Sequence, residues 1–352
     1  MKQLWLRIKQ EAPTELKMRL LRSAEGLCKA VILSPSELQL AENLKINKVS
    51  TDSESDIRLI PHNEHPKSNL MTGTTAIEVV VKDASDEAKV LELIKRGAQY
   101  VIVQCPNWKV IPLENLIART RNRSTLLADV SDLAEAKLAL EALELGVDGV
   151  VFSARSPEEI LEIDRFLRPL QDLQLAPAKI VSTRSLGSGV RVCVDTCELM
   201  KSGEGMLVGS QSSGLFLVEA EVHRNPHVEP RPFRVNAGPV SSYVLTPSFK
   251  TRYLSELKAG DEILIVNRSG RTRKGHVGRT KLERRPMFLV ETEVKDKFYS
   301  LIVQNAETVR LVSVSASKSV TELASGDEVL VFIEEGGRHF GNLVADELVI
   351  ER

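Results

Sequence analysis

A charge asymmetry that the overall balance hides lies between His223 and Tyr253, here called the basic segment. Its only acidic residue is Glu229, and its cations are Arg224, Arg231, Arg234, Lys250 and Arg252. A guanidinium presents a rigid fork that suits a carboxylate or a phosphate, and three prolines stiffen the loop that carries the first arginines. We therefore predict an anion-binding site here, with Asn236 as a neutral hydrogen-bonding residue. The alternative is a solvated basic edge of a sheet.

A second segment, Gly203 to Gly214, is rich in glycine and serine. Backbone amides beside glycine can approach an anion closely, and hydroxyl and amide side chains add donors. The candidate residues for holding a cofactor phosphate are Gly209, Ser210, Gln211, Ser212, Ser213 and Gly214. Their spacing matches neither a dinucleotide fingerprint nor a P-loop, so an ordinary hairpin turn is the alternative.

The best candidate for proton transfer is His339, which lies between Arg338 and Phe340 on a turn flanked by glycines. An imidazole changes charge near neutral pH without help. Glu335 and Asp195 are its candidate partners, and Arg338 is a further candidate for binding the substrate. A lone histidine is more often structural, and we weigh His62 and His65, in a polar loop, and His276, in a basic hairpin, as weaker candidates.

Cysteine spacing gives little support for a metal. Cys193 and Cys197 form a Cys-x3-Cys pair that resembles half of a zinc site, but no second pair of ligands follows it. The four cysteines of the chain are also too few for a disulfide scaffold. We therefore predict no metal site and no structural disulfides.

The first half of the chain repeats a short apolar run followed by a helical pattern, which is typical of a parallel sheet covered by helices. The helical segments Ser85–Arg96 and Ser131–Leu145 begin at a capping residue and are followed by a glycine. Seven or eight strands can be counted. We predict an α/β domain over residues 1–185 that resembles a TIM barrel, with short or missing helices around residues 43–70, because about 180 residues is short for that fold.

In such barrels, catalytic groups collect at or just past the carboxyl ends of the strands. The side chains with that position in the predicted barrel are Trp108, Lys109, Glu114 and Asp129. Lys109 is a candidate for holding an imine or an anion. The alternative, that Lys109 is a surface lysine without a catalytic role, is at least as well supported.

From about Val190 the periodicity changes to short alternating or fully apolar runs separated by glycine-bearing turns, which is typical of β-structure. The segment LSELKAGDEILI, residues 254–265, recurs as VTELASGDEVLV, residues 320–331, at a constant offset of 66 residues. Such an echo indicates an internal duplication. We predict a second, mostly antiparallel β domain over residues 186–352.

The composition limits the partners. Among 352 residues, 47 basic and 48 acidic side chains give a net charge of −1, which leaves no global attraction to nucleic acid or membrane. No stretch approaches the roughly 20 apolar residues of a spanning helix, and the start lacks the apolar core of a signal peptide. We expect a cytoplasmic protein with a small-molecule anionic ligand and no membrane or nucleic-acid partner; whether it forms a homo-oligomer stays open.

One alternative is a non-catalytic β-module that binds nucleic acid through the basic hairpin Arg268–Arg285. Aromatic residues make up only 4% of the chain, which argues against a surface that stacks bases.

Several long motifs follow one another in the second half: GEGMLVGSQSSGLFLVEAEVHRNP, PRPFRVNAGPVSSYV, KTRYLSELKAGDEILIV, QNAETVRLV and GGRHFG. With these motifs the chain resembles the type II 3-dehydroquinate synthase family, best known from archaea. A looser similarity extends back through YVIVQCPNWKVIPLENLIA. The resemblance implies an NAD-dependent oxidoreductase of the shikimate route to aromatic amino acids. It would oxidatively deaminate and cyclise 2-amino-3,7-dideoxy-D-threo-hept-6-ulosonate to 3-dehydroquinate, with release of ammonia.

That chemistry requires a carboxylate anchor, a proton shuttle and hydrogen bonds to hydroxyl groups. Under the resemblance, the cations of the basic segment would hold the substrate carboxylate and the cofactor pyrophosphate, and His339 would move protons. The sequence does not assign each cation to one ligand. In one departure from the family pattern, Gly187–Val190 lacks an acidic residue, so that turn is a poor candidate for cofactor binding. A relative with a different anionic substrate is a further alternative.

Overall fold

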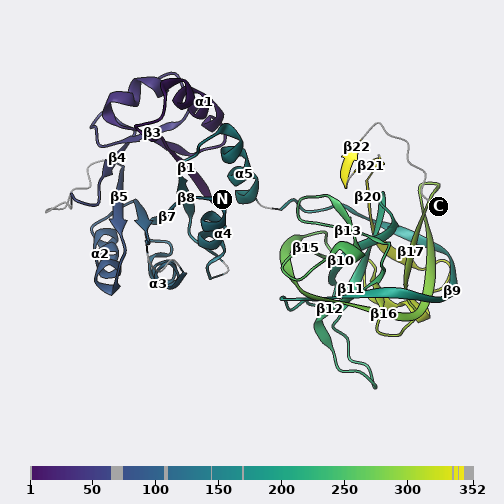
Figure 1. The fold of residues 1–352 in the computed structure, drawn as a ribbon. Coiled ribbons are helices and arrows are strands. Elements are labelled where there is room, and N and C mark those ends of the chain that lie inside the picture. Colours follow the sequence, from purple (N-terminus) through teal and green to yellow (C-terminus); the bar gives the residue numbers. More distant parts are fainter. Residues whose placement is uncertain are drawn as a thin grey trace. The chain divides into compact units, whose positions relative to one another are not determined.

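The computed structural model describes residues 2–64, 74–106, 110–143, 145–168, 170–334, 337–339 and 341–344, with only the backbone described for 337–339 and 342–344. The chain divides into two compact units, Met1–Pro169 and Leu170–Arg352, each described here by itself (Figure 1). The boundary predicted after residue 185 falls inside a strand of the second unit, Leu175–Thr196. Within the described residues, no helix has the length and apolar character needed to cross a membrane.

The first unit is a closed barrel of eight parallel strands. It closes because β1 pairs with β2 on one side and with β8 on the other. The predicted TIM-barrel-like fold is therefore confirmed. The strands are β1 (Gln3–Arg7), β2 (Ala30–Ile32), β3 (Asn47–Ser50), β4 (Ile57–Ile60), β5 (Thr75–Val80), β6 (Tyr100–Gln104), β7 (Thr125–Val130) and β8 (Gly149–Phe152).

Helices connect most of these strands: α1 (Thr14–Ala24), the 3-10 helix η1 (Pro35–Ala41), α2 (Ala84–Lys95), α3 (Val110–Thr120) and α4 (Leu133–Glu141). A further helix, α5 (Pro157–Leu167), follows the last strand, β8. The carboxylates of Asp83 and Asp132 cap α2 and α4 by accepting backbone N–H groups of the first turn. The predicted capping residues, Ser85 and Ser131, lie within two positions of these caps. Residues 51–56, between β3 and β4, contain no helix, which helps the barrel to fit into a short chain.

Apolar side chains from all eight strands fill the barrel interior: Trp5, Ala30, Ile32, Val49, Ile57, Leu59, Ala76, Ile102, Leu127 and Val151. Residues two apart in a strand lie on the same face. Five of these apolar residues are followed, two positions later in the sequence, by a polar residue. These polar residues are Arg7, Glu78, Gln104, Asp129 and Ser153. The interior therefore ends in a polar layer at the carboxyl end of the barrel.

The second unit is a 12-stranded sheet with antiparallel pairing, as predicted. Its longest strands, β9 (Leu175–Thr196) and β16 (Thr272–Val294), pair with each other over most of their length. The other strands of this sheet are β10 (Glu204–Gln211), β11 (Gly214–Glu221), β12 (Arg231–Pro239), β13 (Tyr243–Leu245), β14 (Thr251–Tyr253), β15 (Glu262–Asn267), β17 (Lys297–Gln304), β18 (Arg310–Val312), β19 (Ser317–Ser319) and β20 (Glu328–Ile333). A separate pair consists of β21 (Gly337–His339) and β22 (Asn342–Val344).

The internal duplication predicted from the sequence is confirmed by two copies of one motif. A short strand, a 3-10 turn and a buried strand follow one another as β14, η2 (Leu254–Glu256) and β15, and again as β19, η3 (Val320–Glu322) and β20. In the first copy, the Asp261 carboxylate lies 2.9 Å from Arg252 Nη1. In the second, Asp327 lies 2.6 Å from Lys318 Nζ. The same ion pair therefore fixes the corner of each copy.

The glycine of each corner is required by its backbone conformation. Gly326 has a φ of +95°, and nothing lies within 4 Å of an added Cβ. We expect Gly326→Ala to lower the free energy of unfolding of the second unit by about 1 kcal/mol through backbone strain alone. Urea unfolding of the whole chain measures this. The control is Gly187→Ala, at a position with equally open space and without a positive φ; equal losses in both variants would contradict the prediction.

Candidate functional site

The polar layer of the barrel borders two cavities, whose lining residues we call the barrel mouth. The larger, of about 430 Å³, is lined by residues that include Lys9, Ser131, Glu135, Ser153 and Arg155. The smaller, of about 180 Å³, is lined by residues that include His62 and Glu78. Arg7, Gln104 and Asp129 line both cavities. Because catalytic groups of such barrels lie at this end of the strands, the barrel mouth is the candidate functional site.

The amino end of the barrel has a hollow of about 550 Å³, lined by residues that include Lys2, Arg123 and Asp148. The Asp148 carboxylate accepts a hydrogen bond from the Leu126 N–H at 2.8 Å, so it is engaged in holding β7. Among the described residues that line this hollow, the charged ones are Lys2, Arg123 and Asp148, and each lies outside the strands.

Arg7, the last residue of β1, joins the two carboxylates of the polar layer. Its Nη2 atom lies 2.8 Å from Glu78 Oε1 and 3.1 Å from Asp129 Oδ2. Because one nitrogen makes both contacts, the carboxylates of β5 and β7 come close together. Two such carboxylates repel each other unless a cation lies between them. Arg7 is therefore the group that makes this arrangement tolerable.

Asp129 is the perturbed acid of the barrel mouth. Burial raises the pKa of its carboxyl group, Arg7 opposes that rise, and the nearby Glu78 charge adds to it; the net pKa lies above the usual value. Groups with perturbed pKa values in a cavity are typical of functional sites. A carboxylate that keeps its proton more readily than usual suits proton transfer.

The segments just after the barrel strands carry both cationic and acidic side chains. Lys9 comes just after β1, and Arg155 follows β8. The Arg155 N–H donates to the Glu159 carboxylate at 2.8 Å, and the Ser131 N–H donates to Glu135 at 3.0 Å. The chain's own acids therefore occupy the amino ends of α4 and α5, where an anion could otherwise bind. The side chains of Lys9 and Arg155 are exposed and line the larger cavity. Arg155 Nε contacts Glu159 Oε1 at 3.1 Å, so only the other nitrogens of this guanidinium face a ligand unpaired with Glu159.

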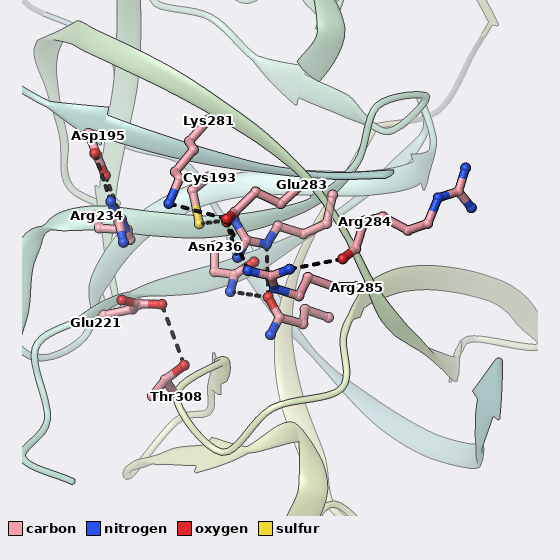
Figure 2. A network of polar contacts seen from close by, with 12 residues as sticks. Cys193, Asp195, Glu221, Arg234, Asn236, Lys281, Glu283, Arg284, Arg285 and Thr308 are labelled. Atoms are coloured by element: carbon pink, nitrogen blue, oxygen red, sulfur yellow. Dashed lines mark hydrogen bonds and ion pairs between the residues drawn. The ribbon is translucent and has the colours of Figure 1, made fainter. Parts of the chain in front are cut away.

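Several cations that the sequence assigned to ligand binding have protein partners in the second unit. Figure 2 shows Arg234 of β12 facing Asp195 of β9. Arg234 Nε and Nη2 lie 2.6 Å and 2.8 Å from the two carboxylate oxygens, and Arg279 Nε lies 2.7 Å from Oδ2. Burial alone would raise the pKa of Asp195, but the two guanidinium groups outweigh it and hold the pKa below its usual range.

Arg231 and Asn236 also contact the chain itself. Arg231 Nε lies 2.6 Å from the buried Glu221 carboxylate, whose pKa is raised by burial against the pull of the surrounding arginines. Asn236 Nδ2 donates to Gln304 Oε1 at 2.9 Å (Figure 2), while its buried Oδ1 has no hydrogen-bond partner. The cavity beside Glu221 and Arg231 is about 40 Å³, which is room for water rather than for a sugar acid.

Two further cations of the basic segment, Arg252 and Lys250, differ from each other. Arg252 pairs with Asp261 and donates to the Glu256 carbonyl at 2.6 Å, so it is part of the repeat corner. The Lys250 side chain is exposed, just before β14. Binding of substrate by either residue stays a prediction.

The segment Gly209–Gly214 forms the turn between β10 and β11, the hairpin that sequence analysis weighed as the alternative. A Cβ on Gly209 would meet the Gly214 carbonyl oxygen at 2.2 Å, and one on Gly214 would meet the Tyr299 ring at 2.1 Å. The glycines therefore allow the hairpin to pack against itself and its neighbour. Ser210 Oγ is buried without a hydrogen-bond partner, Ser212 is buried, and Gln211 and Ser213 are half-buried.

Several of the remaining candidate residues are described only in part or lie outside the described residues. Glu335 and Lys109 lie outside the described residues, as does Trp108. Arg338 and His339 lie in β21, of which only the backbone is described. The carbonyl of Gly341, in the turn after β21, accepts a hydrogen bond from the Thr251 N–H at 3.1 Å. The backbone thus brings the turn after His339 next to the strand that carries Arg252.

Several cations of the basic hairpin have acidic partners. Arg273 contacts Glu198 and Glu204, and both Lys281 and Arg285 contact Glu283 (Figure 2). Such pairs reduce the positive field that phosphate binding would need. In the parts of the chain that the structure describes, no group of three or more His, Cys, Asp or Glu could hold a metal ion. Cys193 is buried, and burial raises the pKa of its thiol to about 11.

Sequence reasoning singled out Asp129 but missed Arg7, Glu78 and Gln104. Each follows a buried apolar residue by two positions, in the carboxyl-terminal half of its strand. That alternation was the available signal, and reading it required knowing which face of each strand lines the interior.

The buried Asp195 pair gives a prediction for stability. Asp195→Ala should lower the free energy of unfolding at pH 7 by about 3 kcal/mol, because Arg234, whose side chain is only 10% exposed, loses its partner. The folded-state pKa lies below the unfolded one, so this contribution is present at neutral pH and is lost as the pH falls below about 4. Arg279→Ala is the control, since that side chain is 65% exposed and its loss should cost less than about 1 kcal/mol. Denaturant unfolding at several pH values measures both; equal losses would refute the assignment.

Asp129 should behave in the opposite way. Its folded-state pKa is raised, so its contribution to stability is full below the unfolded pKa of about 4 and is lost as the pH rises through the folded pKa. We therefore expect Asp129→Asn to raise the melting temperature of the barrel unit at pH 7, and to have little effect at acid pH. An unchanged or lower melting temperature at pH 7 would show that the ionised form of Asp129 is not disfavoured. Asp195→Asn, with the opposite shift, is the control and should lower stability.

Among solved structures, orotidine 5'-phosphate decarboxylase from Pyrococcus horikoshii OT3 aligns with a TM-score of 0.37 and 12% identity, over 45% of this chain and 97% of that one.

Comparisons with known sequences cover both units. The model of the 3-dehydroquinate synthase II N-terminal domain matches residues 1–167, and that of the C-terminal domain matches residues 177–352. The 3-dehydroquinate synthase of Methanocaldococcus jannaschii is 41% identical over 99% of this chain and 99% of that protein. A 3-dehydroquinate synthase homolog of Aquifex aeolicus is 46% identical over 82% of this chain and 86% of that protein. The chain therefore belongs to the 3-dehydroquinate synthase II family.

Proposed function

We propose that this protein is a type II 3-dehydroquinate synthase that uses NAD. Its reaction would be the oxidative deamination and cyclisation of 2-amino-3,7-dideoxy-D-threo-hept-6-ulosonate to 3-dehydroquinate, with release of ammonia. Relatives of nearly full length carry the name 3-dehydroquinate synthase, which supports the product. The open-chain substrate is proposed from the resemblance of the sequence motifs.

The observation that carries the proposal is the mixed charge of the larger cavity. A 2-amino acid presents a carboxylate and an ammonium at the same carbon atom. The cavity of about 430 Å³ is lined by cations, Lys9 and Arg155, and by acids, Asp129 and Glu135. Lys9 and Arg155 would hold the carboxylate, and the acids would accept hydrogen bonds from the ammonium. A phosphate-only ligand would not need the acids.

The side chains of the barrel mouth also suit the first chemical step. The amine must lose a proton before its carbon can be oxidised. Asp129 is the candidate acceptor, because its raised pKa lets it hold a proton readily and Arg7 fixes its orientation. Gln104 and Ser153 are neutral donors for the hydroxyl groups of the substrate.

The hairpin first predicted to bind the cofactor is tightly packed at its two glycines. The space beside the Cα atoms of Gly209 and Gly214 is filled by the hairpin's own backbone and by Tyr299, and binding of a pyrophosphate by this turn stays a prediction. We therefore derive no step from that hairpin. The use of NAD is proposed from the sequence resemblance, and direct binding must test it.

The decisive experiment mixes the purified protein with the amino acid and NAD, and follows NADH absorbance together with 3-dehydroquinate formation. Lys9→Ala and Arg155→Ala should each raise KM by about 10- to 100-fold, since each loses one charged hydrogen bond to the carboxylate. The control is Arg123→Ala, an exposed arginine at the amino end of the barrel. No turnover by the wild type would overturn the function, and an effect of Arg123→Ala equal to the others would move the site to the amino end.

A further inference from the structure

The smaller cavity of the barrel mouth contains a histidine that the amine chemistry does not use. His62 lies in the turn just after β4, and its side chain is exposed. It lines the cavity of about 180 Å³ together with Glu78, Asp129, Arg7 and Gln104. Groups from β5 and β7 and from the turn after β4 thus face one space, beside the place proposed for the amine.

Closing the ring requires a proton to leave carbon. In the substrate named above, the ketone at C6 is next to the methyl carbon C7. Removal of a proton from C7 gives an enolate, which attacks the carbonyl that deamination leaves at C2. The C7–C2 bond forms, the C2 carbonyl becomes an alkoxide, and that oxygen takes up a proton. The step moves one proton from carbon to oxygen and needs no oxidant or reductant.

We propose that His62 is the base of this ring-closing step, and that its imidazolium returns the proton to the C2 oxygen. The proposal rests on the proposed function. An imidazole both accepts and donates protons near neutral pH. Glu78, held by Arg7, lines the same cavity as His62, so a carboxylate lies on the wall of the space in which the proton would move.

The position of the two cavities supports this division of labour. Asp129, Arg7 and Gln104 form the wall that both cavities share. The reacting carbons, C2 and C7, must come within bonding distance of each other for the ring to close. A substrate with its amino acid end in the larger cavity can place its methyl ketone in the smaller one, with both carbons near the shared wall.

The test separates proton removal from oxidation. In D2O, with NADH in place of NAD, the enzyme cannot oxidise the substrate but can still exchange the C7 protons for deuterium, which proton NMR detects. The wild type should catalyse exchange above the background without enzyme, and His62→Ala should lower the exchange rate by about 100-fold or more. Asn63→Ala, a change at the neighbouring exposed residue outside the cavity, is the matched control and should exchange at the wild-type rate.

A second readout uses NAD. His62→Ala should still form NADH and ammonia while 3-dehydroquinate lags behind, because oxidation at C2 does not need the imidazole. Exchange by His62→Ala at the wild-type rate, or no exchange by a wild type that turns over, would overturn the role of His62. A wild type that forms no NADH and no 3-dehydroquinate would instead overturn the proposed function. Melting curves of both variants check that the barrel is folded.

Discussion

The charge balance at the carboxyl end of the barrel depends on one guanidinium, that of Arg7. It contacts Glu78 and Asp129 through the same nitrogen. Without it, two carboxylates of the interior layer would face each other at the top of an apolar core, and one of them would have to remain protonated. Both cavities of the barrel mouth border this group, so the shape and the chemistry of the candidate site follow from the same contact.

The polar layer exists because of the geometry of the strands. Trp5 and Leu127 point into the barrel, so Arg7 and Asp129, two positions further along, must point the same way. In the middle of the barrel such side chains would be buried without water. At the strand ends they meet cavities instead, where a ligand or solvent can complete their hydrogen bonds. The barrel thus concentrates titratable groups at one end without breaking its apolar interior.

The sequence predicted the architecture well, because the fold depends on local periodicity. The change of period near Val190 and the 66-residue echo correspond to the sheet unit and its repeated corners. The roles of charged side chains were harder to predict, since they depend on which residues meet across strands. Asp195 and Arg234 are 39 positions apart, and only the register of β9 and β12 shows that they pair. The cluster of arginines in the basic segment therefore looked more available to ligands than it is.

The two main ionic clusters differ in the ratio of charges, and that ratio bears on function. Around Asp195, two guanidinium groups share one carboxylate, and its pKa falls, so the acid is fully committed to the fold. Around Arg7, two carboxylates share one guanidinium. Burial raises the pKa of Asp129, and Arg7, shared with Glu78, does not cancel that rise. A carboxylate such as Asp129, which shares its guanidinium, is stabilised by a further cation or by a proton. A carboxylate such as Asp195, which already has two guanidinium partners, is not. A substrate ammonium is such a cation, so the ratio of charges favours the barrel mouth over the ion pairs of the sheet as the place where an amino acid binds.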